Sequence, residues 1–283
     1  MIVVTAASGH LGRLVIDQLL RNVPASQVVA AVRSPDKAKD LAARGVTVRA
    51  ADYSRPETLG PALDGAEKVL LISSSEVGKR YGQHAAVVKA AQAAGVKLLA
   101  YTSLLRADTS KLALAAEHKA TEEAIRASGL SFVFLRNGWY LENYTENLGP
   151  ALQHGAMVGS AGTGRIAAAA RADYAAAAVA VLTGAPGKPV YELAGDQRFT
   201  MAELAGEVSR QAGKAIPYQD LPADEYRAVL TGAGLPPPVA DVYVDADVQA
   251  AQGALDDAGG DLRRLIGRPT TPLADAVRAA LKR

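Results

Sequence analysis

The residues at positions 5–12, TAASGHLG, follow the apolar run Ile2–Val4 and have the spacing of a nucleotide-binding loop. Gly9 and Gly12 stand where such a loop has its last two glycines, whereas Ala6 replaces the first. The three glycines serve a tight turn, a close approach of the pyrophosphate, and close packing of helix on strand. We therefore predict a phosphate-binding loop, with a purely structural turn as the alternative. Alanine weakens this loop only if position 6 requires a positive φ.

The residue after the second apolar run indicates which nucleotide fits. Dinucleotide sites for NAD place Asp or Glu near this point to hold the ribose hydroxyls, whereas NADP requires a cation. Here Arg33 directly follows Val28–Val32, and no acidic residue ends the run. A guanidinium beside Ser34 can bind a 2′-phosphate through several donors. We expect NADPH as the cofactor, and a solvated surface arginine is the alternative.

Two further segments follow predicted strands. Asp52, in AADYS, could accept a hydrogen bond from the adenine amino group or cap a turn, and the residues leave both readings open. Ser73, Ser74 and Ser75 end the fourth apolar run, where ligands of such sheets bind. Small hydroxyl side chains allow a cofactor to lie close to the backbone, although one of them could instead cap a helix.

The sequence lacks a common proton donor of reductases, a Tyr with a Lys four residues later on one helix face. None of the ten tyrosines has that lysine. The segment EHKATEEAI instead places His118 and Glu122 four apart, either as an acid–base pair or as an ordinary pair on a helix surface. A reaction that needs strong acid catalysis is therefore disfavoured. Hydride addition to a quinone needs less help, because water can protonate the stabilised hydroquinone anion.

The segment RNGWYLENY, at 136–144, offers groups that could hold a quinone. Asn137 and Asn143 carry amides, while Trp139, Tyr140 and Tyr144 offer flat apolar surfaces for an aromatic ring. Core packing is the alternative for the aromatic residues. We take Asn143, Tyr140 and His118 as the candidate catalytic residues.

The composition excludes several classes of function. The 31 basic and 29 acidic residues leave a net charge of +2, which predicts no nucleic-acid surface and no polybasic membrane anchor. The absence of cysteine rules out disulfides and thiol chemistry, and the four scattered histidines predict no metal site. The longest apolar stretch, Ala175–Leu182, is far below the roughly 20 residues that span a bilayer. With a strand predicted from residue 2, we expect no signal peptide and a cytoplasmic location.

The first half of the chain alternates apolar runs with amphipathic segments. The predicted strands are Ile2–Thr5, Val28–Val32, Val46–Ala50, Lys68–Ser73, Leu98–Ser103 and Ser131–Arg136. The predicted helices are Leu11–Arg21, Asp36–Arg44, Pro56–Leu63, Lys79–Ala94 and Glu117–Ser128. Nearly continuous apolar strands indicate a sheet covered on both faces. We therefore predict an α/β fold with a doubly wound, Rossmann-like parallel sheet.

The regular alternation of apolar runs and amphipathic segments ends after residue 136. We predict a dinucleotide-binding domain over 1–136 and a smaller C-terminal α/β substrate lobe over 137–283, which returns one helix and one strand to the main sheet. The stretch GAMVGSAGTGRIAAAARADY predicts a glycine-rich hairpin. Further predicted elements are a helix at Asp173–Leu182, a strand at Val190–Leu193, and helices at Met201–Ala212, Asp224–Thr231 and Leu273–Leu281, with a break at GLPPP.

Several segments together resemble the NmrA-like, atypical short-chain dehydrogenase/reductases, and among them the bacterial NADPH:quinone oxidoreductases. The resemblance covers nearly the whole chain and rests on TAASGHLG, AVRSPDKAKDLAARGVTVRAADY, KVLLISSSEVGKR, AAGVKLLAYTSLLRADTS, LRNGWYLENY, RADYAAAA and YELAGD. The family loop usually reads TGATGxLG, so that Ala6 is a departure. This departure bears on the affinity for the cofactor rather than on its identity.

The resemblance implies a set of residues that hold NADPH. They are Ala6, Ala7, Ser8, Gly9, His10, Leu11, Gly12, Arg33, Ser73, Ser74, Ser75, Asn137, Gly138, Trp139, Tyr140, Leu141, Glu142 and Arg171. The function implied is hydride transfer from NADPH to a small-molecule quinone, and a homodimer is compatible with it. One alternative is a non-catalytic NADP(H)-binding redox sensor of the same family. Another is a reductase or isomerase acting on sugars or flavonoid-like molecules.

Overall fold

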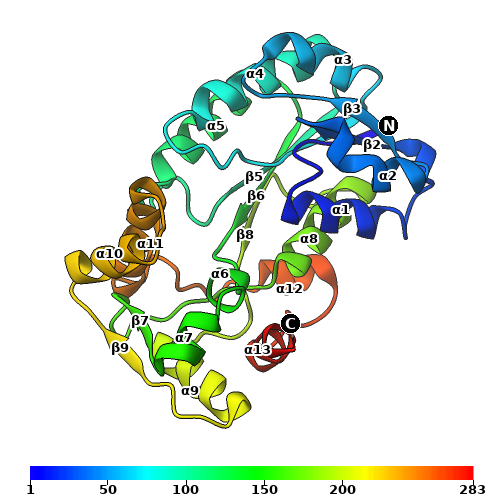
Figure 1. Ribbon diagram of the computed structural model, residues 1–283. Helices are drawn as coiled ribbons and strands as arrows, with labels where there is room; N and C mark the ends of the chain where they lie inside the picture. The colour runs from blue at the N-terminus through cyan, green and yellow to red at the C-terminus, as the bar shows by residue number, and fades with distance from the viewer. Residues whose placement is uncertain (283) are drawn as a thin grey trace. The chain divides into compact units, whose positions relative to one another are not determined.

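A computed structural model describes residues 1–282, in which strands and helices alternate through the first half of the chain (Figure 1). Within these residues seven strands form one sheet, in the order β3–β2–β1–β4–β5–β6–β8. Every neighbouring pair is parallel. The strands are β1 (Ile2–Val4), β2 (Val28–Val32), β3 (Thr47–Ala50), β4 (Lys68–Leu71), β5 (Leu98–Leu104), β6 (Phe132–Asn137) and β8 (Val190–Leu193). The predicted doubly wound, Rossmann-like parallel sheet is confirmed.

The inner strands of the sheet are buried on both faces, which explains why β1, β2 and β4 are almost entirely apolar, whereas the edge strand β3 is partly exposed and contains Thr47 and Arg49. Val3 on β1 pairs with Val29 on β2 and Val69 on β4, and all three point into one core. Tyr101 and Phe134 extend the same core across β5 and β6. Alternate residues of a strand face opposite sides of the sheet, so that a strand covered on both faces needs apolar residues at consecutive positions. Burial on both faces thus accounts for the continuous apolar runs in the sequence.

Helices cover the two faces of this sheet (Figure 1). Helices α3, α4 and α5 lie on the face that contains the Val3 core, and α1 packs against α8 on the other face. The segments around the sheet are α1 (His10–Leu19), η1 (Ala25–Gln27), η2 (Pro35–Ala38), α2 (Lys39–Ala43), η3 (Pro56–Thr58), α3 (Leu59–Leu63), α4 (Arg80–Ala93), α5 (Ala115–Ala127) and α8 (Arg171–Thr183). Helix α4 ends as the sequence AAGVKLLAY predicts, with Gly95 at a φ of +67°.

The chain divides into two compact units. The first contains Met1–Asp108, Ala116–Asn137 and Arg171–Leu193, and the second contains Thr109–Ala115, Gly138–Ala170 and Ala194–Arg283. The first unit thus includes α8 and β8, which come from beyond residue 137. A domain boundary at residue 137 stays a prediction.

The second unit is mostly helical. Its elements are α6 (Glu142–Thr145), α7 (Gly149–His154), β7 (Met157–Gly159), α9 (Met201–Ala212), β9 (Tyr218–Asp220), α10 (Ala223–Gly232), α11 (Pro237–Ala251), α12 (Asp261–Ile266) and α13 (Leu273–Leu281). Helix α9 begins with a capping box, in which the Thr200 hydroxyl accepts from the Glu203 N–H and the Glu203 carboxylate accepts from the Thr200 N–H. The helix therefore starts where the sequence predicts.

The hairpin predicted in the glycine-rich stretch is wrong. Strand β7 pairs in parallel with β9, from about 60 residues further on, rather than with its own neighbour. Ile166 instead forms an isolated antiparallel bridge with Phe199. Helix α11, which begins directly at the prolines of GLPPP, was not predicted. Proline breaks a helix interior but suits the first turn of a helix, and here it marks a start.

In residues 1–282 no helix combines the length and the apolar character needed to cross a membrane. The same residues contain no group of three or more His, Asp or Glu side chains that could hold a metal ion.

Candidate functional site

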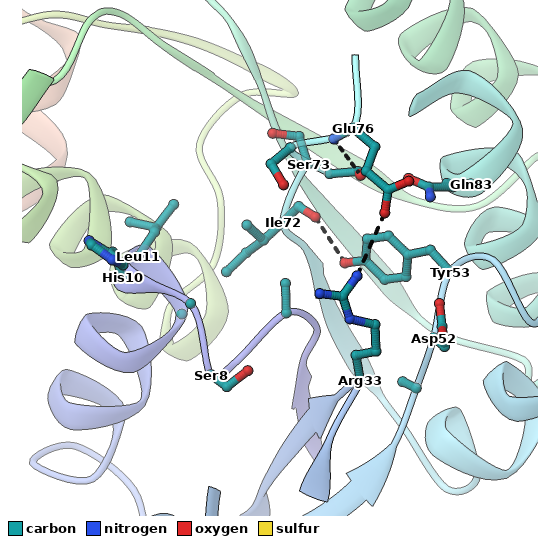
Figure 2. A pocket seen from close by; sticks show the side chains of 16 residues that line it. Ser8, His10, Leu11, Arg33, Asp52, Tyr53, Ile72, Ser73, Glu76 and Gln83 are labelled. Carbon is teal, nitrogen blue, oxygen red and sulfur yellow. Dashed lines mark hydrogen bonds and ion pairs between the residues drawn. The ribbon is translucent and has the colours of Figure 1, made fainter. Parts of the chain in front are cut away.

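A pocket of about 320 Å³ lies in the first unit, where β1, β2, β3 and β4 end (Figure 2). In open parallel sheets ligands bind at this carboxyl edge. The lining residues are Ala6, Ser8, Gly9, His10, Leu11, Gly12, Arg33, Ala51, Asp52, Tyr53, Ile72, Ser73, Ser74, Ser75, Glu76 and Gln83. Ten of the residues that the sequence suggests as cofactor ligands are thus brought together here. Ala7, fully buried, is the one residue between Ala6 and Gly12 that does not line the pocket.

Ala6 adopts the left-handed backbone conformation, with a φ of +47°. Its carbonyl oxygen accepts a hydrogen bond from the Gly9 N–H at 3.0 Å, and this bond closes the turn of the loop. Position 6 therefore does require the positive φ that glycine adopts without strain, and an alanine there costs about 1–2 kcal/mol. The loop keeps the geometry of a nucleotide-binding turn in spite of its alanine.

Ala6→Gly should raise the free energy of unfolding by about 0.5–1 kcal/mol. Relief of the left-handed strain outweighs the extra chain entropy that glycine adds to the unfolded state, about 0.5–1 kcal/mol. Urea unfolding monitored by circular dichroism measures the difference. Ala42→Gly is a matched control in the exposed interior of α2, where the same change should destabilise the chain. Equal losses in the two variants would contradict the assignment of strain to Ala6.

Gly12 lets helix α1 approach the loop closely. A Cβ atom at this position would lie 2.5 Å from the Ala6 carbonyl oxygen and 2.7 Å from the Ala7 Cα. Both are backbone atoms, which cannot rotate away. No side chain caps the N-terminus of α1 and no acidic residue occupies its first turn. The first-turn N–H groups and the positive end of the helix dipole therefore face the pocket without an internal anion, as a bound pyrophosphate requires.

A hydrogen-bonded tyrosine closes one wall of the pocket. The Tyr53 hydroxyl lies 2.9 Å from the Ile72 carbonyl and also contacts the Thr5 hydroxyl, which lies 3.0 Å from the Leu70 carbonyl, so that two hydroxyl protons are shared among these three contacts. Burial raises the pKa of the Tyr53 phenol well above its usual value. This tyrosine is therefore a fixed neutral wall that ties the ends of β1, β3 and β4 together (Figure 2).

Asp52, beside this tyrosine, forms a turn. Its Oδ1 accepts from the Ser54 N–H at 2.9 Å, as the turn reading of this residue predicts. The side chain also lines the pocket. One carboxylate oxygen is thus committed to the backbone.

The serine segment after β4 is held by bonds to its backbone. The Ser73 N–H donates to the Thr102 hydroxyl, and the Ser74 N–H donates to His84 Nε2, both at 2.9 Å. Because Nε2 accepts, the neutral His84 ring carries its proton on Nδ1, which lies 3.0 Å from the Thr121 hydroxyl. A buried chain from α4 and α5 thus fixes this side of the pocket.

His118 lies in the same buried chain rather than on the surface of α5. Its Nδ1 is 2.7 Å from the Tyr101 hydroxyl, and the side chain is almost fully buried. Burial lowers the pKa of His118 to about 3 and that of His84 to about 4, so that both rings are neutral at pH 7. His118 does not line the pocket. The expected pairing with Glu122, as an acid–base pair or on the helix surface, is wrong, because both side chains are buried and have other partners.

Glu122 belongs to a buried ionic cluster at the ends of β5, β6 and β8. Arg136 donates to both carboxylate oxygens of Glu122, at 2.8 and 2.6 Å, and to Glu192 at 2.8 Å. Burial opposes the charged guanidinium, but its bonds to these two carboxylates outweigh burial and raise the pKa of Arg136. The Ser103 hydroxyl also donates to Glu122, at 2.6 Å. The i,i+4 spacing of His118 and Glu122 in the sequence therefore does not indicate that the two side chains interact.

The remaining candidates from the sequence lie outside the described pocket lining. In the first unit, Asn137 ends β6 with a buried Oδ1 that has no hydrogen-bond partner among residues 1–282. Arg171 opens α8, and its Nη1 lies 3.4 Å from His10 Nδ1, so that this cation does reach the glycine loop. Gly138, Trp139, Tyr140, Leu141, Glu142 and Asn143 lie in the second unit, where the segment pairs with Ala169. Trp139 is buried, as its core-packing alternative predicts.

Sequence reasoning missed Ala51, Tyr53, Ile72, Glu76 and Gln83. Tyr53 lies three residues after the predicted strand Val46–Ala50 and could have been found by the rule that ligands meet the carboxyl ends of strands. Glu76 and Gln83 lie beyond the end of β4, in the connecting segment and in helix α4. No local pattern distinguishes them, because their place in the pocket depends on how that segment turns back.

Comparison with known proteins places these features in context. A family model described as NAD(P)H-binding matches residues 6–185. The chain is 54% identical to quinone oxidoreductase 2 of Escherichia coli (strain K12), over 98% of this chain and 97% of that protein. It is 29% identical to an NmrA-like family domain-containing oxidoreductase, flvB, of Aspergillus flavus, over 98% and 94% of the two chains. The crystal structure of an NADPH-dependent quinone oxidoreductase of Escherichia coli complexed with NADPH superposes with a TM-score of 0.96, at 52% identity, over 99% and 100% of the two chains.

Proposed function

The chain belongs to the NAD(P)H-binding family, as its resemblance to NmrA-like proteins predicts, and we propose that it is an NADPH-dependent quinone oxidoreductase. The observation that carries the cofactor assignment is Arg33 at the mouth of the pocket formed by the glycine loop. The assignment of the acceptor is supported by the likeness to a quinone oxidoreductase over almost the entire chain. A cytoplasmic location and a homodimer remain predictions.

The residues present fit such a dinucleotide. A Cβ at Gly12 would meet backbone atoms, which is the close packing that the third loop glycine provides. The first turn of α1 offers N–H groups to the pyrophosphate, and Arg33 offers a guanidinium to the 2′-phosphate. Arg171, beside His10, adds a second cation near the loop. The buried, unpaired Oδ1 of Asn137 can accept a hydrogen bond from the part of the cofactor that lies at the end of β6.

Bound NADPH would supply a hydride, two electrons and one proton, that reduces the quinone, and water would supply the second proton of the hydroquinone. We propose that the Asn143 amide donates to a quinone oxygen and that the Tyr140 ring supports the quinone's flat face. His118 is left out of this proposal, since its buried neutral ring bonds Tyr101 and does not line the pocket. Because the product anion is stable, these residues need mainly to align the reactants.

The test is oxidation of NADPH by the purified protein with soluble benzoquinone, measured as loss of nicotinamide absorbance. Parallel reactions contain NADH, no enzyme, or no quinone. Saturable turnover that is faster with NADPH at low concentration is the expected result. Binding of NADPH without turnover on any simple quinone would overturn the proposed reaction and favour the redox-sensor alternative.

Arg33→Ala should weaken the binding of NADPH by about 10- to 100-fold, since charge-assisted bonds to a phosphate contribute about 1.5–3 kcal/mol. The affinity for NADH, which lacks the 2′-phosphate, should change by less than about threefold. Calorimetric titration of both cofactors measures the two effects. Arg55→Ala, which removes an exposed arginine outside the pocket, is the control and should alter neither affinity. Equal losses for NADPH and NADH would mean that Arg33 does not contact the 2′-phosphate.

A further inference from the structure

A carboxylate reaches the end of β2 from a different part of the chain. The sequence has no acidic residue where β2 ends, which is the place of the acid that holds ribose hydroxyls in NAD sites. In the structure, however, Glu76 Oε1 lies 3.6 Å from Arg33 Nη1 (Figure 2). Both side chains line the pocket. The Arg33 guanidinium is thus paired with a carboxylate from the segment that follows β4.

The backbone that carries Glu76 is anchored, whereas its side chain has two cations within reach. The Glu76 N–H donates to the Ser74 hydroxyl at 3.1 Å. Further along, the Gly78 and Arg80 N–H groups each donate to the Glu117 carboxylate at 3.0 Å. The second oxygen of the Glu76 carboxylate lies 3.5 Å from Lys79 Nζ. A carboxylate displaced from Arg33 therefore keeps a cationic partner, which lowers the cost of displacement.

We propose that Glu76 is a specificity-determining residue that sets the preference between cofactors with and without a 2′-phosphate. This inference rests on the proposed dinucleotide site. A 2′-phosphate competes with the Glu76 carboxylate for Arg33, so that binding of NADPH requires the carboxylate to give way. A cofactor with a free 2′-hydroxyl leaves the ion pair in place and donates that hydroxyl to Glu76. The residue thus weakens NADPH binding and supports NADH binding.

The alternative is an ordinary surface ion pair with no part in binding. The side chains of Arg33 and Glu76 are 72% and 37% exposed, and ion pairs with such exposure stabilise a fold very little. Removal of the carboxylate should therefore leave the folded chain intact. An effect on cofactor selectivity without an effect on stability separates the two explanations.

The experiment is calorimetric titration of the unaltered chain, Glu76→Gln and Glu57→Gln with NADPH and with NADH. Glu57 pairs with Arg55 at 3.0 Å on the surface and does not line the pocket, so that Glu57→Gln removes the same charge from an arginine pair elsewhere. Glu76→Gln should tighten NADPH about two- to fivefold, because Arg33 is released. The same variant should weaken NADH about two- to tenfold, because a charged acceptor is lost. Glu57→Gln should change neither affinity by more than about twofold.

The same substitution of Glu76 in an Arg33→Ala variant tests whether Glu76 affects NADPH binding through Arg33. There the NADPH gain from Glu76→Gln should shrink, because no guanidinium remains to be released, while the NADH loss should persist. Shifts of NADPH and NADH in the same direction, or no shift of either, would overturn the role of Glu76. Failure of the unaltered chain to bind either cofactor would instead overturn the proposed function. The two failures are therefore distinguishable, because the role of Glu76 can fail while the unaltered chain still binds both cofactors.

Discussion

Gly12→Ala should reduce the affinity for NADPH by at least about 10- to 100-fold. The added methyl would lie 2.5 Å from the Ala6 carbonyl oxygen and 3.0 Å from the Ala7 carbonyl carbon, so that the loop and the start of α1 must move apart. The N–H groups that meet the pyrophosphate move with them, and charge-assisted hydrogen bonds contribute about 1.5–3 kcal/mol each. Overpacking of this kind also destabilises the fold, by about 1–3 kcal/mol. Calorimetric titration with NADPH, at a temperature where the variant is folded, measures the loss.

Gly60→Ala is the matched control for this change. Gly60 lies in α3, and a Cβ built there meets no atom within 4 Å. Gly60 does not line the pocket, so that the variant should bind NADPH normally. Its free energy of unfolding should change by less than about 1 kcal/mol, because the helix preference of alanine is offset by the restriction that the following Pro61 imposes. An unchanged NADPH affinity in Gly12→Ala would show that the glycine loop does not hold the pyrophosphate, and would remove the main support for the cofactor site.

Arg136→Met should destabilise the chain by about 3–5 kcal/mol. Arg136 and Glu122 are both about 4% exposed, and the guanidinium also bonds Glu192 and Asp108. Removal of the cation leaves the buried Glu122 carboxylate beside other acidic groups, with the half-exposed Arg126 at 3.9 Å as a weak cationic partner. A buried charge that has lost its main partner costs far more than the pair itself contributes. For a chain of this size, the midpoint of thermal unfolding should fall by roughly 6–15 °C. Denaturant unfolding followed by circular dichroism provides the free energy.

Two further variants define the origin of that loss. Arg44→Met breaks an exposed pair with Asp17, 2.5 Å apart, and should cost less than about 1 kcal/mol. Glu122→Gln added to Arg136→Met removes the stranded charge and should recover part of the lost stability. If the double variant is no more stable than Arg136→Met alone, lost packing rather than a stranded charge explains the effect.

The amino-acid sequence by itself determined the elements of the first unit and the loop that they carry. Strands β2 and β8 and helices α9 and α13 have the predicted bounds, and the other strands of the seven-stranded sheet differ from their predictions by one or two residues at an end. These elements follow from local patterns. A strand buried on both faces requires a continuous apolar run, and a helix cap requires particular residues at the end of the helix. For the same reason the glycine spacing and Arg33 could be assigned to a nucleotide pocket before its shape was known.

Only the tertiary structure decided which distant residues meet. Glu76 and Gln83 join Arg33 in the pocket, although no local pattern of the chain indicates it. His118 and Glu122 show the converse, since neighbours on one helix turn face different buried partners, Tyr101 and Arg136. Partners of this kind depend on packing between elements far apart in the chain, which hydrophobic periodicity does not encode.

Backbone conformation is the other property that the tertiary structure decided. The sequence shows that Ala6 departs from the usual glycine, but not whether the departure carries strain. The positive φ appears only once the loop is closed by the hydrogen bond from Gly9 and packed against α1. Strain at a single residue persists because the many contacts around it outweigh its cost of about 1–2 kcal/mol, and those contacts exist only in the folded chain.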